Sequence, residues 1–166
     1  MTQKTAIVLA AGKGTRMKSD LPKVLVPVCG RPMIEYVLDA LIVSGVTRVI
    51  AVIGYRAELV EAAIDGRPNV EFVLQTEQLG TGHAVMMCRD KLQDSDGPVL
   101  IVTGDAPLMQ SQSLAALFAE YERHPAACIL GTVYSDYPGS LGRIVRDSAG
   151  EFERIVEFRD ASETQR

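Results

Sequence analysis

Short aliphatic runs alternate with helical patterns along most of the chain. Runs too short for helices and bounded by turn residues predict buried strands over Thr5–Ala10, Arg48–Ile53, Val70–Leu74, Val99–Val102 and Ala127–Val133. Apolar residues between these runs recur at helical spacing, which predicts helices over Pro32–Ser44, Leu59–Ile64 and Thr81–Lys91, and one beginning at Ser111, a good N-cap residue. Such alternation is typical of an α/β fold with a mostly parallel sheet covered by helices on both faces.

The rhythm changes after Val133. The stretch "GRIVRDSAGEFERIVEF" predicts two strands, Gly142–Arg146 and Phe152–Phe158, with a turn at 147–150 between them. These strands would form a C-terminal β-hairpin. The chain has 166 residues, about the length of one domain, and we find no internal repeat or linker in it. We therefore expect residues 1–166 to form a single domain.

Net charge and the length of the apolar stretches limit the kinds of partner that we expect for this protein. The net charge of −4 argues against general nucleic-acid binding, which needs a basic face. No apolar stretch approaches the ~18 residues of a membrane span, and the N-terminus does not resemble a signal peptide. We expect a cytoplasmic protein without nucleic-acid or membrane partners. The cysteines, Cys29, Cys88 and Cys128, are far apart and outside any zinc-ligand spacing, so we expect reduced thiols.

The first predicted strand runs directly into the loop "LAAGKGTRMKSDLPK" at Leu9–Lys23. Ligands of open α/β sheets bind beyond the carboxyl ends of the strands, where this loop lies. Gly12 and Gly14 lack a Cβ, so backbone N–H groups can approach an anion closely. Arg16 and Lys23 add positive charge in forms that suit phosphate. The loop therefore predicts a polyphosphate site.

Two common phosphate loops do not fit the spacing of this one. A Walker loop would need a glycine at Ile7, and a dinucleotide-binding fingerprint would need one at Met17. Taken alone, the Gly-x-Gly pattern is also compatible with an ordinary glycine turn beside surface lysines. Lys13 and Lys18 are more typical of solvated charges than of direct ligands.

Further motifs give the glycine loop a more specific interpretation. It resembles the signature of the sugar-1-phosphate nucleotidyltransferases, a Gly-x-Gly-Thr-Arg loop followed by Pro-Lys. The stretch "LQTEQLGTGHA" resembles the uridyltransferase domain of the bacterial bifunctional N-acetylglucosamine-1-phosphate uridyltransferase/glucosamine-1-phosphate acetyltransferase family. "VTGDAPL", "LGRIVRD" and "IVEFRDA" follow in that family's order. The resemblance covers essentially the whole chain and implies the Rossmann-like nucleotide-diphospho-sugar transferase fold.

The resemblance also implies substrates, a cofactor and site residues. The substrates would be UTP and N-acetylglucosamine-1-phosphate, with Mg²⁺ held by Asp105. Arg16 and Lys23 would have catalytic roles at the triphosphate, and Gln75, Gly80 and Thr81 would recognise the uracil. The implied nucleotide-binding residues are Leu9, Ala10, Ala11, Gly12, Gly14, Lys23, Gln75, Gly80 and Thr81. The implied residues for the sugar phosphate are Thr103, Gly104, Asp105, Gly142 and Glu157.

The same residues have simpler interpretations. Asp105 could cap a turn, Gln75 could be a solvated strand end, and Glu157 could lie on an exposed strand face. Gly142 could simply begin the hairpin. His83 and His124 fit ordinary helix positions, and we assign neither any chemistry.

The implied activity is that of a UDP-N-acetylglucosamine pyrophosphorylase that serves cell-envelope precursor synthesis. Two alternatives stay open: a nucleotide-binding module with little turnover, and a nucleotidyltransferase for another sugar-1-phosphate. The family's Asn-Thr-Gly segment, a later asparagine and the acetyltransferase β-helix have no match here. We therefore expect a C-terminally incomplete domain that is a monomer, because trimers are expected only with the β-helix.

Overall fold

The structure is a computed structural model that describes residues 3–93 and 95–165, apart from the Arg16 side chain. It divides into two compact units, Met1–Ile129 and Leu130–Arg166. Each unit is described by itself below. None of the helices in the described ranges combines the length and the apolar character that crossing a lipid bilayer requires.

The first unit is built on a parallel sheet of four strands. Their order across the sheet is β5–β4–β1–β6, and their bounds are β1 Thr5–Ala10, β4 Arg48–Ile53, β5 Val70–Leu74 and β6 Val99–Thr103. The central strand β1 pairs with β4 on one side and with β6 on the other. The four strands lie where they were predicted, and β1 and β4 are buried almost throughout. The predicted burial is wrong for much of β6, where Val99 and Ile101 are exposed, and β5 is only partly buried. Because the chain builds outward from β1 and then returns to its other side, the loop after β1 lies where the strand order reverses.

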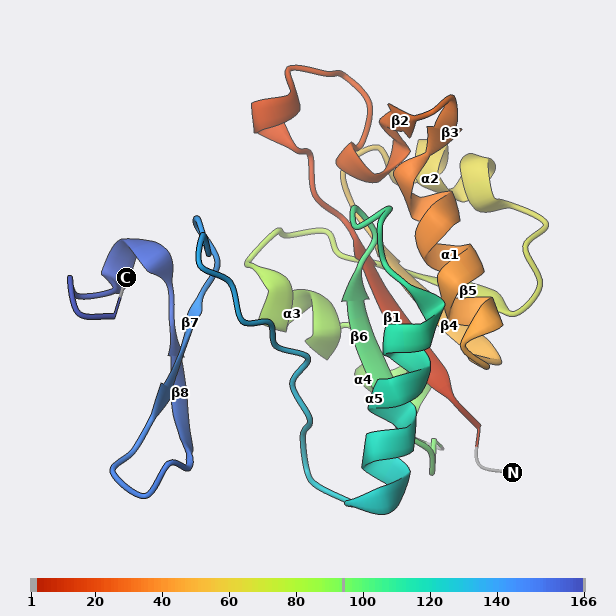
Figure 1. Ribbon diagram of the computed structural model, residues 1–166. Helices are drawn as coiled ribbons and strands as arrows, with labels where there is room; N and C mark the ends of the chain where they lie inside the picture. Colours follow the sequence, from red (N-terminus) through yellow and green to blue (C-terminus); the bar gives the residue numbers. More distant parts are fainter. Residues whose placement is uncertain (1–2, 94, 166) are drawn as a thin grey trace. The chain divides into compact units, whose positions relative to one another are not determined.

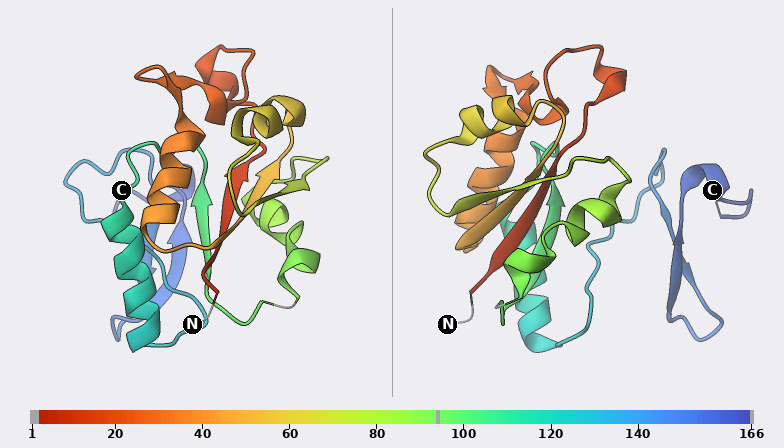
Figure 2. Two further views of the ribbon diagram at one scale, coloured as in Figure 1. Left: turned by 90° about the vertical axis from the view of Figure 1, so that its right-hand side faces the viewer. Right: turned by 180° about the vertical axis from the view of Figure 1, so that it is seen from behind.

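Helices cover both faces of this sheet (Figures 1 and 2). One face carries α1, α2 and α5, with bounds Met33–Val43, Ala57–Ile64 and Ser111–Arg123. The other face carries α3 and α4, with bounds Thr81–Met86 and Arg89–Leu92. The predicted α/β architecture with helices on both faces is confirmed.

The alternation of side chains along β1 explains the two cores. Ala6, Val8 and Ala10 face the larger core, which α1 completes with its apolar stripe. Ile7 faces the smaller core, together with the buried Cys88. Both faces of β1 are apolar because both are covered, as expected for a strand inside a parallel sheet.

Two helix predictions need correction. The helix predicted over Thr81–Lys91 is divided into α3 and α4. At the break, the Cys88 N–H donates to the Val85 carbonyl three residues back, at 3.0 Å, which is a tighter turn than that of an α-helix. The Cys88 side chain is buried in the smaller core. Ser111 is the first residue of α5 rather than its N-cap, a position held by Gln110. No side-chain capping bond forms at Gln110.

The strand predicted over Ala127–Val133 is wrong, since the structure assigns no strand to these residues. Their apolar pattern resembles that of the other buried strands. A strand also needs a neighbour for its backbone hydrogen bonds, and the described residues provide none for this segment. Conversely, a short antiparallel pair, β2 (Pro27–Val28) with β3 (Arg31–Pro32), was not predicted.

The second unit contains the predicted hairpin. Its strands are β7 (Arg143–Arg146) and β8 (Phe152–Val156), followed by a 3₁₀ turn, η3 (Phe158–Asp160). The Asp147 carboxylate accepts hydrogen bonds from two backbone N–H groups of the turn, each at 2.9 Å, which explains why the chain reverses there.

Candidate functional site

A cavity of about 320 Å³ opens in the first unit where three parallel strands end. Leu9 and Gly12 come from the end of β1 and its loop, Gln75 follows β5, and Thr103 and Asp105 come from the end of β6. A second hollow, of about 620 Å³, is lined by Lys13, Gly14, Thr15, Met17, Lys23 and Gln78. Lys23 and Gln78 line both spaces and so stand at their boundary.

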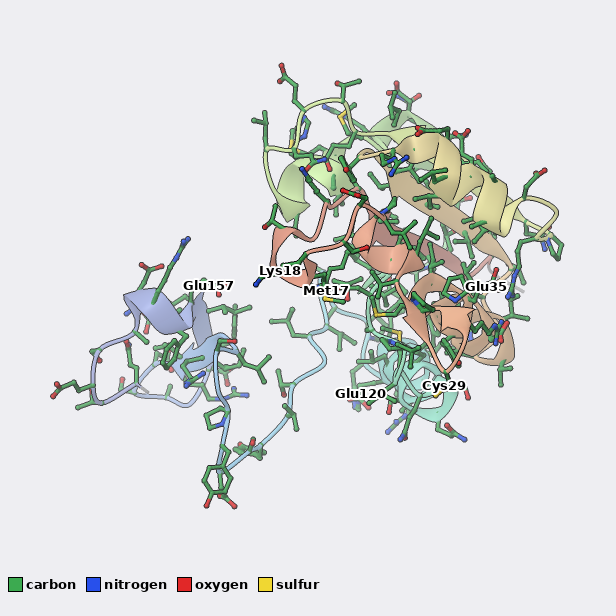
Figure 3. All side chains as sticks on the ribbon, turned by 90° about the horizontal axis from the view of Figure 1, so that it is seen from above. Met17, Lys18, Cys29, Glu35, Glu120 and Glu157 are labelled. Carbon is green, nitrogen blue, oxygen red and sulfur yellow. The ribbon has the colours of Figure 1, made fainter. Side chains whose placement is uncertain are left out.

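Backbone hydrogen bonds anchor the glycine loop after β1. The Ala11 carbonyl accepts from the Tyr55 N–H at 3.1 Å and from the Gln78 side-chain amide at 2.9 Å. A 3₁₀ turn, η1 (Thr15–Met17), forms the outer part of the loop, where Figure 3 labels Met17 and Lys18. The loop is thus tied at its base to the segments that follow β4 and β5.

Gly54 allows these segments to converge. A Cβ at this position would lie 2.9 Å from the Ala11 Cβ, closer than real Cβ atoms come, and it would also crowd the Gln75 carbonyl oxygen at 3.0 Å. Only glycine lets the glycine loop and the end of β5 approach each other here. The approach brings the polar groups of both segments to one cavity.

Lys23 is placed by its neighbours along the chain and by Gly14. It begins a 3₁₀ turn, η2 (Lys23–Leu25), whose next residues, Val24 and Leu25, are buried. Gly14 has a φ of 68°, and a Cβ there would lie 2.6 Å from the Lys23 Cβ. The bare glycine backbone therefore supports the Lys23 stem, and the ammonium extends toward the cavity.

The Lys23 ammonium forms an ion pair with the Asp105 carboxylate. Burial raises the pKa of Asp105, but hydrogen bonds from Lys23 and Thr103 outweigh burial, so the pKa lies below its ordinary value. Asp105 is therefore ionised at neutral pH. A carboxylate and an ammonium of opposite charge face the same cavity, where they can interact with a ligand that carries both charges.

Gln75 provides a nearly buried amide at the same cavity. It is only 4% exposed. Its side-chain nitrogen donates to the Gly80 carbonyl at 3.2 Å and lies 3.0 Å from the His83 Nδ1. The site thus combines a glycine loop, an ammonium, a carboxylate and a buried amide, which is a set suited to a phosphorylated ligand with a polar ring.

Residues 6–157 match the family model of the MobA-like NTP transferase domain. The chain belongs to this family. The resemblance inferred from the motifs is confirmed at the level of this family.

Two curated relatives are 45% and 46% identical to this chain over the aligned residues. The chain is 45% identical over 166 residues to the bifunctional protein GlmU of Geobacillus sp. (strain WCH70), and 46% identical to that of Listeria innocua serovar 6a. These matches cover 100% and 99% of the chain and 36% of each relative. The chain therefore spans about a third of the length of these relatives.

Solved structures support the fold. The crystal structure of HddC from Yersinia pseudotuberculosis, complexed with GMP-PN, superposes with a TM-score of 0.71. It is 24% identical, and the match covers 92% of this chain and 68% of that one. This similarity shows the transferase fold alone.

The structure brings together most of the residues singled out from the sequence. Those that line the first cavity are Leu9, Ala11, Gly12, Lys23, Gln75, Gly80, Thr81, Thr103 and Asp105. Gly14 lines the second hollow instead. Their assigned roles stay predictions.

Other singled-out residues lie elsewhere. Ala10 is buried in the core, and Gly104 is buried behind the cavity, where its N–H donates to the Leu9 carbonyl at 2.9 Å. The Arg16 side chain lies outside the described residues. Gly142 and Glu157 belong to the second unit and lie just outside the two strands, although both were predicted within them. They flank the pair that Arg143 forms with Val156 at the open end of the hairpin.

Gln78, which lines the cavity, and His83, which contacts Gln75, were not predicted as members of the site. Gln78 lies three residues after Gln75, and its amide connects the segment after β5 to the glycine loop. Their position inside the "LQTEQLGTGHA" motif was the available signal. Sequence alone does not say which polar residue of such a motif faces the ligand and which one holds a neighbour.

Proposed function

We propose that this domain transfers a uridylyl group from UTP to N-acetylglucosamine-1-phosphate, forming UDP-N-acetylglucosamine and releasing pyrophosphate. The observation that carries this proposal is the convergence of the glycine loop, Lys23, the buried Gln75 amide and Asp105 on one cavity. Membership of the NTP transferase family and the identity to GlmU proteins support it.

Each part of the cavity has a role in binding UTP. The open backbone at Gly12 and the Lys23 ammonium receive the phosphates, because unhindered N–H groups and a cation stabilise anionic oxygens. The second hollow, with Lys13 and Lys23, gives the β- and γ-phosphates room beside positive charge. Gln75, Gly80 and Thr81 line the opposite wall, where the uracil would lie.

The chemistry requires charge stabilisation more than proton transfer. An oxygen of the sugar phosphate attacks the α-phosphorus, and a new P–O bond forms while the bond to the oxygen that bridges to the β-phosphorus breaks. Pyrophosphate leaves with that electron pair. The nucleophile is already an anion at neutral pH, so no base has to remove a proton. Lys23 lowers the barrier by holding the phosphates in line and by offsetting the charge on the leaving group.

The residues present fit the implied Mg²⁺. Asp105 offers an ionised carboxylate at the cavity wall. No cluster of three or more histidine, cysteine or acidic side chains suited to a metal occurs among the described residues. A single carboxylate is sufficient in principle, because Mg²⁺ commonly takes one or two carboxylates and completes its shell with phosphate oxygens and water. When bound, Mg²⁺ would supply further positive charge at the phosphates.

The test is a pyrophosphate-release assay on the chain with UTP, Mg²⁺ and N-acetylglucosamine-1-phosphate, beside a calorimetric UTP titration. Release that requires this sugar phosphate supports the proposal. UTP binding without release under any condition would instead identify a nucleotide-binding module. Faster release with another sugar-1-phosphate would assign a different acceptor, and failure to bind UTP would refute the proposal.

A further inference from the structure

The segment that follows β4 contacts the glycine loop at three points along its length. At the base of the loop, the Tyr55 N–H donates to the Ala11 carbonyl at 3.1 Å. Near its far end, the Arg56 guanidinium donates to the Asp20 carbonyl at 2.9 Å. Between these two points, the Lys13 ammonium lies over the Tyr55 ring, 5.2 Å from the centre of the ring. The two hydrogen bonds tie the loop to one segment at both ends, so they keep Lys13 within reach of the ring.

The contact between Lys13 and Tyr55 is a cation–π interaction. An ammonium within about 6 Å of a ring centre is attracted to the negative face of the ring. Tyr55 is half-buried, whereas Lys13 is exposed. An exposed lysine otherwise samples many rotamers, and ordering such a side chain costs conformational entropy. The ring therefore keeps in one region an ammonium that would otherwise sample many positions.

Lys13 is held at the second hollow. It lines this hollow of about 620 Å³ but not the first cavity, whereas Lys23 lines both. Of the residues that the structure describes, Tyr55 lines neither space, so its ring contacts a residue of the site without facing the ligand itself. Under the proposed function, the α-phosphate lies near Lys23 and the β- and γ-phosphates lie in the second hollow. Lys13 then contacts only phosphates that a monophosphate lacks.

We infer that Tyr55 is a positioning residue, which holds the Lys13 ammonium at the second hollow for the two terminal phosphates of the nucleotide. The inference rests on the proposed function and extends it, because it assigns part of the preference for a triphosphate over a monophosphate to a ring that does not touch the ligand. An ammonium carries more than one N–H donor, so it can stay over the ring while it donates to phosphate oxygens. Much of the entropy cost of ordering Lys13 is then met before the nucleotide binds.

The experiment measures the affinities of UTP and UMP by calorimetry for the wild-type chain and its variants. Tyr55→Leu removes the ring, while the backbone N–H at this position keeps its bond to Ala11. We expect the ratio of the UMP to the UTP dissociation constant to fall about two- to fivefold, the worth of one exposed cation–π contact. The affinity for UMP should stay unchanged. Tyr55→Phe retains an aromatic ring, so it should keep the wild-type ratio.

Lysine variants show whether the ring acts through Lys13. Lys13→Met should lower the same ratio at least about tenfold, because a charge-assisted hydrogen bond to phosphate is lost. Adding Tyr55→Leu to Lys13→Met should lower it no further, because independent contributions add, whereas a ring that acts through the lysine has nothing left to position. Lys18→Met is the matched control, since exposed Lys18 lies in the same loop and, in the described part of the chain, lines neither space (Figure 3). This control should leave the ratio unchanged.

The outcomes separate the inference from the proposed function. A wild-type chain that does not bind UTP, or that binds another nucleoside triphosphate more tightly, refutes the proposed function and the inference that rests on it. UTP binding with the same ratio in wild type and in a Tyr55→Leu variant of native circular dichroism refutes only the role of Tyr55. Tighter binding of UTP by Tyr55→Leu would overturn that role too, because the ring would then hold Lys13 away from the phosphates. Equal losses from Tyr55→Leu with and without Lys13 would also overturn it, because the ring would not act through the lysine.

Discussion

Replacing Gly14 by alanine tests how the glycine loop places Lys23. The φ of 68° at Gly14 is a left-handed conformation, which costs an alanine roughly 1–2 kcal/mol. The added Cβ would also lie 2.6 Å from the Lys23 Cβ and 3.3 Å from its Cα. These atoms belong to the backbone and the first carbon of the side chain, so they cannot rotate away as the end of a long side chain can.

The contact sets the size of the expected effect on function. Carbon atoms prefer to be ~3.5–4.0 Å apart, so the two segments must separate by about 1 Å. Val24 and Leu25 are buried next to Lys23, which limits how far η2 can yield. A displacement of this size at a phosphate-positioning group can reduce the rate of transfer by up to about 10²-fold. UTP affinity should fall with it, because the proposed role of Lys23 includes contacts with the phosphates of bound UTP.

The matched control is Gly66→Ala. Gly66 also has a positive φ, 82°, but a Cβ there would meet nothing within 4 Å. Both variants should lose stability in urea denaturation through the left-handed backbone, and Gly14→Ala should lose more because of its contact with Lys23. Gly14→Ala alone should also lose UTP affinity by calorimetry and pyrophosphate release. If Gly14→Ala binds UTP and releases pyrophosphate as well as Gly66→Ala does, the glycine does not position Lys23 and the reasoning fails.

Three further substitutions test the charges. Lys23→Ala should lower turnover at least ~10-fold and change the free energy of unfolding by under ~1 kcal/mol, because the ion pair is partly exposed; equal activity would remove Lys23 from the mechanism. Asp105→Asn should weaken the dependence of UTP binding on Mg²⁺, and an unchanged Mg²⁺ titration would contradict the assigned role. Hydrogen bonds from Arg48 and Lys91 lower the pKa of Glu71 to about 2. Its carboxylate therefore stabilises the fold above its unfolded pKa and loses this effect as pH falls toward 2. Glu71→Gln should cost roughly 1 kcal/mol at neutral pH after allowing for solvent screening, and the difference from wild type in denaturation experiments should shrink in acid.

Local sequence pattern was sufficient for most of the fold. The four strands of the sheet are short aliphatic runs with turn residues at their ends. Their residues indicate burial on both faces, which holds for β1 and β4 but not for β6, where Val99 and Ile101 are exposed. The same pattern failed at Ala127–Val133, because an apolar run specifies burial and not a hydrogen-bonding partner. The break between α3 and α4 also escaped prediction, because it depends on the burial of Cys88 in the core.

The residues of the candidate site could be predicted from the sequence, but the contacts between their side chains could not. The glycine loop, Lys23 and Asp105 follow strands that end at one edge of the sheet, so their approach was expected. The ion pair between Lys23 and Asp105 and the hydrogen bond from Gln78 to the Ala11 carbonyl join residues from separate loops. Such contacts depend on loop geometry, for which a single sequence carries no periodic signal.

The ion pair between Lys23 and Asp105 also makes binding at this cavity an exchange of counter-ions. A nucleotide phosphate that takes Lys23 as its partner leaves the Asp105 carboxylate, only 22% exposed, without a cation. A free divalent cation that takes Asp105 leaves Lys23 without its anion. A complex of the cation with the nucleotide supplies a partner for each side chain: its phosphate pairs with Lys23, and its cation pairs with Asp105. The cavity should therefore bind the cation–nucleotide complex in preference to the nucleotide or the cation alone.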